Sequence, residues 1–181
     1  GPHASHVEAA LERLRAQRFL ARLWERDASL WTSDRATQAA IRQRLGWLTI
    51  VPVMAQRTDA VRHLVEEIRG NGLTHAVLLG MGGSGLFSEV CRHTFGTAQG
   101  HLDLTVLDTT DPTAIRAYQR RGSLERLLVI ISSKSGSTSE VSALSKYFYE
   151  TLKAVDPSPG AHCLAITDGG SPLEAEAKAQ R

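Results

Sequence analysis

The sequence predicts an α/β fold, in which a three-layer, open parallel sheet carries helices on both of its faces and follows a helical N-terminal arm. After Gly72, four short apolar runs occur without polar alternation, as expected for parallel strands that are covered on both faces. Helical patterns separate these runs at the spacing of βαβ units. The predicted strands span residues 75–79, 104–107, 127–131 and 163–166.

The region before Gly72 has a different pattern, because its apolar residues recur at helical spacing. It predicts three helices. The first covers residues 11–24, the second begins near Ser33 and is weakened by Pro52, and the third covers residues 61–68. We therefore expect two parts, a helical arm over residues 6–71 that packs on the sheet domain, and the sheet domain itself over residues 72–181. The three tryptophans of the arm are expected to be large core anchors.

Three helix starts carry capping residues. Asp111-Pro112 places an N-cap before a proline at the first helical position. Ser137 with Glu140, and Ser171 with Glu174, have the spacing of capping boxes. The first two starts lie between consecutive predicted strands, so they predict crossover helices.

Composition narrows the class of protein. The 181 residues are 42% hydrophobic and 22% charged, with a formal net charge of +2, which is ordinary for a soluble globular domain and gives no general attraction to nucleic acid. No stretch has the length of a membrane span and no secretion signal is present. Two isolated cysteines are typical of a reduced compartment. We expect a cytoplasmic protein with no nucleic-acid or membrane partner.

Both ends of the sequence predict a piece of a longer protein. Gly1-Pro2-His3 has no Met and resembles the remnant of a cleaved tag, so residues 1–5 are expected to be disordered. At the other end, a helix predicted from Ser171 stops at Arg181, after about two turns. A truncated sheet would leave the fourth strand as an open edge, which favours pairing with another copy and predicts a homodimer.

A glycine-rich loop follows the first predicted strand. Gly80, Gly82 and Gly85 match the dinucleotide-binding pattern, and Asp108 stands where a ribose-binding acid would be. Glycines let backbone amides approach an anion at a helix N-terminus. The same glycines also suit a tight strand-to-helix turn without a ligand. This loop alone does not decide between a dinucleotide, another phosphate ligand and a purely structural turn.

A serine-rich loop, Ser132–Ser139, follows the third strand. It carries six hydroxyls and Lys134, more than one helix cap requires. A phosphate dianion needs several converging donors, which hydroxyls, loop amides and a helix N-terminus provide. A dinucleotide needs only the glycine-rich loop, whereas a sugar phosphate uses both loops. The pair of loops therefore favours a sugar phosphate.

These motifs resemble the sugar isomerase (SIS) domain of the glucose-6-phosphate isomerase family. Residues 80–84 resemble its Gly-Ile-Gly-Gly-Ser segment, and residues 133–140 its Ser-Lys-Thr-x-Thr-Thr-x-Glu phosphate motif. Residues 108–112 are similar to the segment after its second strand. Residues 27–32 and the serine-rich loop are closest to the isomerase part of bifunctional transaldolase/phosphoglucose isomerases. The resemblance implies a Rossmann-like SIS fold, and it covers roughly residues 20–181.

The resemblance implies the roles of individual residues. The phosphate is expected to bind to Ser133, Lys134, Ser135 and Thr138, and the sugar to border Gly83 and Ser84. Val141 replaces a threonine of the family and is left out of the site, and Ser137 is expected to be used by its capping box.

The implied ligands are glucose 6-phosphate and fructose 6-phosphate, with no cofactor and no metal. The family's glutamate base and ring-opening histidine come from later segments that nothing in this chain matches, so no catalytic residue is assigned. Glu89 is expected to serve packing or capping, and His75, His93, His101 and His162 to be structural.

Two other functions stay open at this point. One is a non-catalytic SIS module that senses sugar phosphates, and the other is a dinucleotide-binding Rossmann domain.

Overall fold

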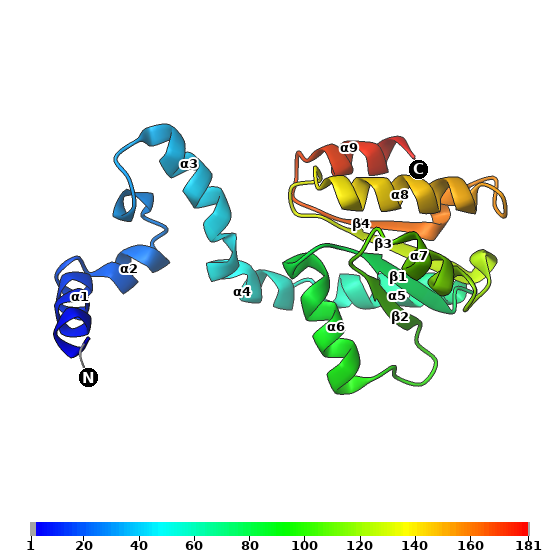
Figure 1. Ribbon diagram of the computed structural model, residues 1–181, viewed down its shortest axis with the longest axis horizontal. Coiled ribbons are helices and arrows are strands. Elements are labelled where there is room, and N and C mark those ends of the chain that lie inside the picture. Colours follow the sequence, from blue (N-terminus) through cyan, green and yellow to red (C-terminus); the bar gives the residue numbers. More distant parts are fainter. Residues whose placement is uncertain (1–2, 181) are drawn as a thin grey trace. The chain divides into compact units, whose positions relative to one another are not determined.

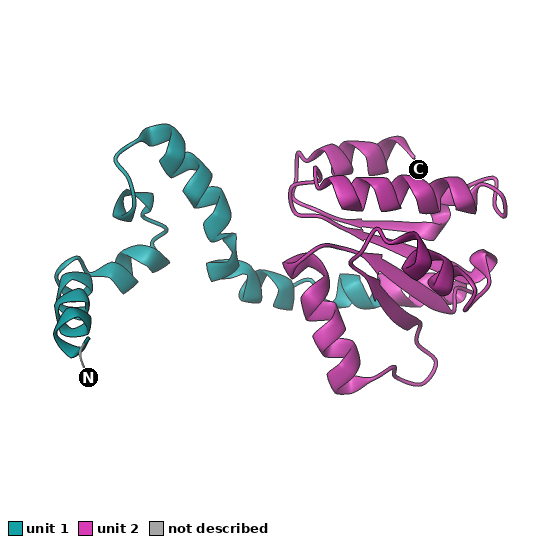
Figure 2. Cartoon of the chain, viewed as in Figure 1, with its two compact units in different colours: residues 1–63 teal, residues 64–181 magenta. Residues whose placement is uncertain are grey.

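The computed structural model describes residues 3–180, which form two compact units, one up to His63 and one from Leu64 onward (Figures 1 and 2). Helix α5, Thr58–Gly70, crosses this boundary. Residues 1 and 2 of the segment predicted to be disordered lie outside the described residues, and helix α1 already includes Ala4 and Ser5. The packing of the arm on the sheet domain stays a prediction.

The first unit is built from short helices. Arg18 has a left-handed φ of 49°, and it divides the helix predicted over residues 11–24 into two. The second predicted helix begins close to the expected position, and Asp34 is its N-cap, with its carboxylate accepting a hydrogen bond from Thr37 N. The helices are α1 Ala4–Ala16, α2 Phe19–Trp24, α3 Arg35–Arg44 and α4 Ile50–Ala55, with 3-10 turns at Ala28–Leu30 and Leu45–Thr49.

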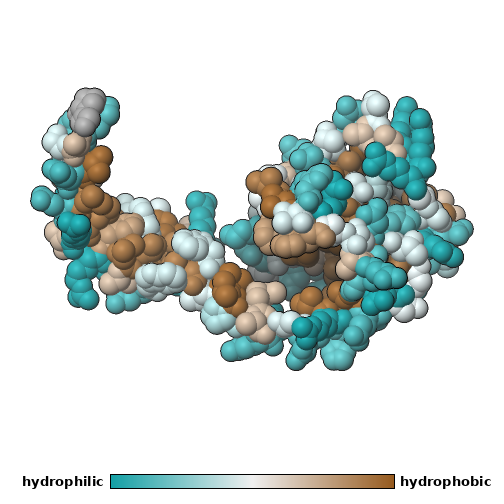
Figure 3. All heavy atoms as spheres, turned by 90° about the horizontal axis from the view of Figure 1, so that it is seen from below, coloured by the Kyte–Doolittle hydropathy of each residue, from teal (hydrophilic) through white to brown (hydrophobic). Residues whose placement is uncertain are grey.

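Much apolar surface of this first unit is exposed, as the brown side chains in Figure 3 show. Trp24 and Trp47 are each 61% exposed, and Trp31 is 47% exposed. The prediction that these tryptophans are core anchors is therefore wrong in this structure. The physical reason is the small core of the unit, in which the buried apolar side chains are Ala28, Leu45 and Leu48.

The second unit contains a four-stranded parallel sheet in the order β2-β1-β3-β4. Its strands are β1 His75–Leu79, β2 Asp103–Leu107, β3 Leu127–Ser132 and β4 Cys163–Ile166. Its helices, besides the end of α5, are α6 Gly83–Phe95, α7 Pro112–Gln119, α8 Ser139–Leu152 and α9 Pro172–Ala179, with 3-10 turns at Leu124–Arg126 and Pro159–His162. The predicted α/β fold is confirmed, and the bounds of β1 and β4 are those predicted.

Alternate residues of each strand face opposite sides of the sheet, which produces two separate cores. One core joins Val77, Val129 and their same-face neighbours to helices α7, α8 and α9. The other joins Ala76 and Leu128 to Ile68 near the end of α5. Since helices cover both faces, near-continuous apolar strands are what this sheet requires.

Helix α6 exposes most of its own apolar side chains. Leu86, Phe87, Val90 and Phe95 are all exposed, whereas Gly85 is the residue of α6 that is buried. The core on this face of the sheet is correspondingly smaller than the one under α8. An exposed apolar helix face of this kind is more typical of an interaction surface than of an ordinary solvated helix.

Within residues 3–180, no helix is long and apolar enough to cross a membrane.

Candidate functional site

The two loops singled out in the sequence lie side by side at the carboxyl ends of β1 and β3. These strands are neighbours in the middle of the sheet, and the chain moves from β1 outward in one direction to β2 and in the other direction through β3 to β4. Such a switch point is where open α/β sheets bind ligands. A hydrogen bond joins the loops directly, because Ser132 Oγ donates to the carbonyl oxygen of Ser84 at 3.4 Å.

The glycine-rich loop needs its glycines for the backbone. Gly82 is the N-cap of α6 and has φ 56° and ψ −126°. Residues other than glycine rarely adopt this backbone conformation. A Cβ on Gly85 would lie 2.7 Å from the carbonyl oxygen of Gly80 and 3.1 Å from Val106 Cγ1. Gly83 has no atom within 4 Å of such a Cβ. Gly82 and Gly85 thus shape the turn, and Gly83 leaves open space at the start of the helix.

We expect Gly85→Ala to lower the free energy of unfolding by about 1–3 kcal/mol, because the added methyl overpacks the contacts of α6 with Gly80, after β1, and with Val106 of β2. Urea unfolding followed by circular dichroism measures this loss. Gly83→Ala is the matched control, since its methyl enters open space, and we expect a change within about 0.5 kcal/mol. Equal losses in the two variants would contradict the assigned packing role of Gly85.

The serine-rich loop divides into an inner and an outer part. Ser133 is only 3% exposed, and its Oγ accepts a hydrogen bond from Gly136 N at 3.2 Å and lies 3.3 Å from Thr138 Oγ1. Ser135 is exposed, and its Oγ accepts hydrogen bonds from the backbone N and the Oγ of Ser137. Ser133 and Thr138 are thus in direct contact, whereas Ser135 belongs to the outer part.

The predicted capping box of Ser137 and Glu140 is wrong. Helix α8 begins at Ser139 with Thr138 as its N-cap, and no side chain accepts a capping hydrogen bond there. Ser137 is one residue too early in the chain, and its hydroxyl donates to Ser135 at 3.0 Å instead. The Ser137 hydroxyl therefore belongs to the loop, which sequence reasoning missed. The capping roles of Asp111 and Ser171 are confirmed, with Thr113 N and Glu174 N as donors.

The turn after β4 supports the serine-rich loop from behind. Ser133 N donates to the carbonyl oxygen of Ile166 at 3.0 Å, which extends the β3–β4 ladder into the loop. Thr167 Oγ1 and Asp168 N both lie within hydrogen-bond distance of the Lys134 carbonyl oxygen, at 3.4 and 3.2 Å. Sequence reasoning missed this support. Thr167 and Asp168 directly follow a predicted parallel strand, and ligands bind at the carboxyl ends of such strands. This rule could have indicated both residues.

The electrostatic character of the site comes from two helix N-termini and one lysine. Helices α6 and α8 both begin at these loops, and their unpaired amides favour an anion. Lys134 is exposed, and its Nζ lies 3.5 Å from Asp168 Oδ2. Among residues 3–180, no group of three or more His, Cys, Asp or Glu side chains has an arrangement that could hold a metal ion.

The acids and histidines considered in the sequence have other partners. Glu89 binds Arg92 at 2.8 Å, and hydrogen bonding from Arg92 lowers the pKa of this carboxyl group. The ring of His162 is buried, with Nδ1 2.9 Å from the Leu127 carbonyl oxygen and Nε2 3.2 Å from Asp156 Oδ2. Burial lowers the pKa of His75, although the charge of Asp103 opposes that shift. These contacts suit structural roles.

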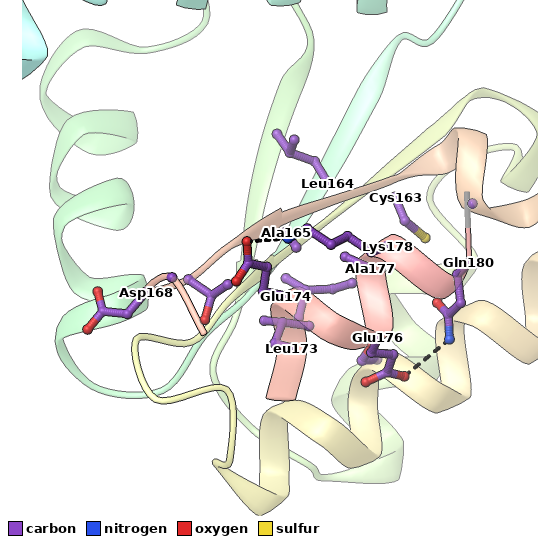
Figure 4. Close-up of a pocket in the computed structure, with 15 residues that line it drawn as sticks. Cys163, Leu164, Ala165, Asp168, Leu173, Glu174, Glu176, Ala177, Lys178 and Gln180 are labelled. Atoms are coloured by element: carbon purple, nitrogen blue, oxygen red, sulfur yellow. Dashed lines mark hydrogen bonds and ion pairs between the residues drawn. The ribbon is translucent and has the colours of Figure 1, made fainter. Parts of the chain in front are cut away.

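A hollow of about 470 Å³ runs along β4 and α9 beyond the two loops (Figure 4). Leu164, Ala165 and Leu173 contribute apolar walls, and Glu174 and Lys178, whose side chains are paired at 2.8 Å, contribute polar ones. Asp168 lies at the end of the hollow near the serine-rich loop. None of the six predicted ligand-binding residues lines this hollow, so it is distinct from the predicted phosphate site.

No family model matches the chain. It is 35% identical over 112 residues to a glucose-6-phosphate isomerase of Synechococcus sp. (strain JA-3-3Ab), covering 60% of this chain and 21% of that protein. It is 28% identical over 181 residues to a glucose-6-phosphate isomerase of Geobacter sulfurreducens, covering 94% of this chain and 33% of that protein. The chain thus spans between a fifth and a third of the length of these relatives.

Two solved structures share the fold. The crystal structure of a hypothetical protein from Thermus thermophilus has a TM-score of 0.66 at 25% identity, covering 99% of this chain and 40% of that one. A glucose-6-phosphate isomerase from Chlamydia trachomatis has a TM-score of 0.61 at 23% identity, covering 86% and 28%. The parallel sheet and its helices agree with the SIS-like fold predicted from the sequence. The chain is a distant relative of the glucose-6-phosphate isomerases.

Proposed function

We propose that this chain is the sugar-phosphate-binding SIS domain of a glucose-6-phosphate isomerase. The hydrogen bond between Ser132 and Ser84 is the observation that carries the proposal, because it joins the serine-rich and glycine-rich loops into one site. The phosphate would bind to Ser133, Lys134, Ser135 and Thr138, and the sugar would lie near Gly83 and Ser84. The distant relation to glucose-6-phosphate isomerases supports the same ligand class.

In this proposal the parent protein interconverts glucose 6-phosphate and fructose 6-phosphate, and this chain holds the substrate without catalysing the reaction. Isomerisation needs a base that moves a proton between C1 and C2 through an enediol. Glu89 of α6 is paired with Arg92 and has a lowered pKa, which makes it a poor base. The base and the ring-opening acid would come from another part of the parent. Robust isomerase turnover by the 181-residue chain would contradict this part of the proposal.

The resemblance also supports finer features of the parent. The residues at 27–32 and in the serine-rich loop favour a protein that also carries a transaldolase domain. We propose in addition that the protein is cytoplasmic and dimeric.

Titration with glucose 6-phosphate tests the phosphate site. We expect Lys134→Met and Thr138→Val each to weaken binding about 10- to 150-fold, since a hydrogen bond to a charged group contributes about 1.5–3 kcal/mol. Ser133 is a less clean target, because its Oγ also accepts from Gly136 N and its loss would alter the loop itself. Chemical shifts of the loop amides provide the measurement.

Lys146→Met is the matched control, since Lys146 is an exposed lysine on α8, away from the serine-rich loop that precedes this helix, and we expect unchanged affinity. Unphosphorylated glucose should bind far more weakly than glucose 6-phosphate. If the Lys134 and Thr138 variants bind as tightly as the original chain, the phosphate site is wrong.

The dinucleotide alternative has one favourable observation, because Gly85 provides the close helix–strand approach that the dinucleotide-binding pattern requires. Enhancement of NADH fluorescence on mixing would support it. A non-catalytic sensor would bind sugar phosphates while its intact parent shows no isomerase activity.

A further inference from the structure

Lys134 has a carboxylate counter-ion within the protein itself. It is the one cationic residue in the segment from Ser132 to Thr138, and its Nζ lies 3.5 Å from Asp168 Oδ2. The two side chains are 63% and 61% exposed, so both can change rotamer without disturbing the packed core. An arriving phosphate would therefore meet a lysine whose charge is partly compensated.

The backbone keeps Asp168 beside Lys134. Asp168 N donates to the Lys134 carbonyl oxygen at 3.2 Å, and Thr167 Oγ1 reaches the same oxygen at 3.4 Å. Upstream of this contact, Ser132 pairs with Ile166 in the β3–β4 ladder. The carboxylate thus stays close to the site even when its side chain turns away from Lys134.

We propose that Asp168 is a resident counter-ion that competes with the ligand's phosphate for Lys134 and so sets how tightly the site binds anions. This inference rests on the proposed function, because it requires that the serine-rich loop binds phosphate. A dianion placed near Lys134 gains the attraction of the lysine and is repelled by the carboxylate.

The competition also affects which anions bind. A small anion that reaches only Lys134 takes the place of the Asp168 carboxylate as partner of the lysine. The exchange of one anionic partner for another adds little binding free energy. A phosphate seated in the loop gains further donors from Ser135, Thr138 and the N-terminus of α8. Asp168 would therefore favour ligands that engage the whole loop.

The test is a titration of the 181-residue chain and its Asp168→Asn variant with inorganic phosphate at low ionic strength, followed by amide chemical shifts. We expect about three- to tenfold tighter binding in the variant, because one negative charge near the anion is removed. The gain should shrink as salt is raised to about 0.5 M, since the pair is exposed to solvent. Asparagine keeps the backbone N–H that binds Lys134, so the turn should stay folded.

Glu150→Gln is the matched control. It makes the same change in net charge and also removes the partner of an exposed lysine, Lys153, at 2.6 Å, but it lies in the last turns of α8 rather than at its start. We expect it to leave phosphate affinity unchanged. In a Lys134→Met background, Asp168→Asn should give a clearly smaller gain in phosphate affinity, because Asp168 then has no lysine for which it competes with the phosphate.

The outcomes separate this inference from the proposed function. If the original chain binds phosphate and Asp168→Asn binds it no more tightly, the counter-ion role is wrong while the phosphate site stands. An equal gain in phosphate affinity in Glu150→Gln would likewise overturn the counter-ion role of Asp168, because the change in net charge alone would then explain the effect. If neither the original chain nor Asp168→Asn binds phosphate, both the inference and the phosphate site fail.

Discussion

Phe148→Ala is expected to lower the free energy of unfolding by about 3–5 kcal/mol, the range for truncating a fully buried phenylalanine. Phe148 is 0% exposed, and its ring meets the rings of Tyr118 and Tyr147 edge-on, at centroid distances of 6.1 and 5.6 Å. Folded domains are stable by only about 5–15 kcal/mol in total, so such a loss is a large share of the whole. Urea unfolding measured by circular dichroism gives the value.

Phe95→Ala is the matched control, because Phe95 is the same residue type and is 81% exposed. We expect a change within about 0.5 kcal/mol there. Phe148→Leu should recover most of the lost stability, since it refills much of the cavity. Comparable losses in Phe148→Ala and Phe95→Ala would show that the core under α8 does not hold the sheet domain together.

Most of the sheet could be predicted because each strand is a continuous apolar run. A strand that is covered on both faces leaves no polar alternation, and Val77, Leu78 and Leu79 are accordingly all buried. The helix starts at Pro112 and Pro172 could be predicted because a cap is a local interaction, set by residues within one turn. Local chemistry thus determined the succession of strands and helices along the chain and several of their bounds.

The start of α8 could not be predicted for the same local reason. Ser137, Thr138 and Ser139 can each cap a helix, so the sequence offers competing starts and the capping-box spacing selected the wrong one. In the structure Ser137 binds Ser135, and the helix begins one residue later than a cap at Ser137 implies. The competition between neighbouring hydroxyls is settled by the packing of the loop, which the sequence does not show.

The pairing of Lys134 with Asp168 depends on tertiary structure. The two residues become neighbours only because β3 and β4 are adjacent and parallel, with Ser132 opposite Ile166. The strand order itself is not contained in the periodicity of the sequence. Sequence reasoning therefore found the serine-rich loop but not the turn that supports it.

The exposed apolar side chains of α6 and of the first unit are a second limit of local reasoning. Periodicity shows that a helix has an apolar face, and it does not show what covers that face. Phe87 of α6 is 74% exposed and Trp47 of the first unit is 61% exposed. For the tryptophans this is why the expectation of core anchors failed.

Gly136→Ala is expected to lower the free energy of unfolding by about 2–5 kcal/mol and to weaken phosphate binding as well. Gly136 has φ 66°, where a side chain costs roughly 1–2 kcal/mol. A Cβ there would also lie 2.8 Å from the backbone N of Leu173, so the loop or the start of α9 must shift, at a further cost of about 1–3 kcal/mol. Since Gly136 N donates to Ser133 Oγ, that shift would move the hydroxyls proposed to bind phosphate.

Two glycines of the neighbouring turn separate the two contributions. Gly170 has φ 79° with no atom within 4 Å of an added Cβ, and Gly169 has neither a positive φ nor a close neighbour. Gly170→Ala should therefore lose only the backbone part, about 1–2 kcal/mol, and Gly169→Ala should lose little or gain slightly. We expect the free energy of unfolding to fall from Gly169→Ala to Gly170→Ala to Gly136→Ala, and glucose 6-phosphate to bind more weakly to Gly136→Ala. This result would show that contact with α9 sets the shape of the serine-rich loop. If Gly136→Ala matches Gly170→Ala in stability and binds the ligand normally, the loop holds its shape without α9.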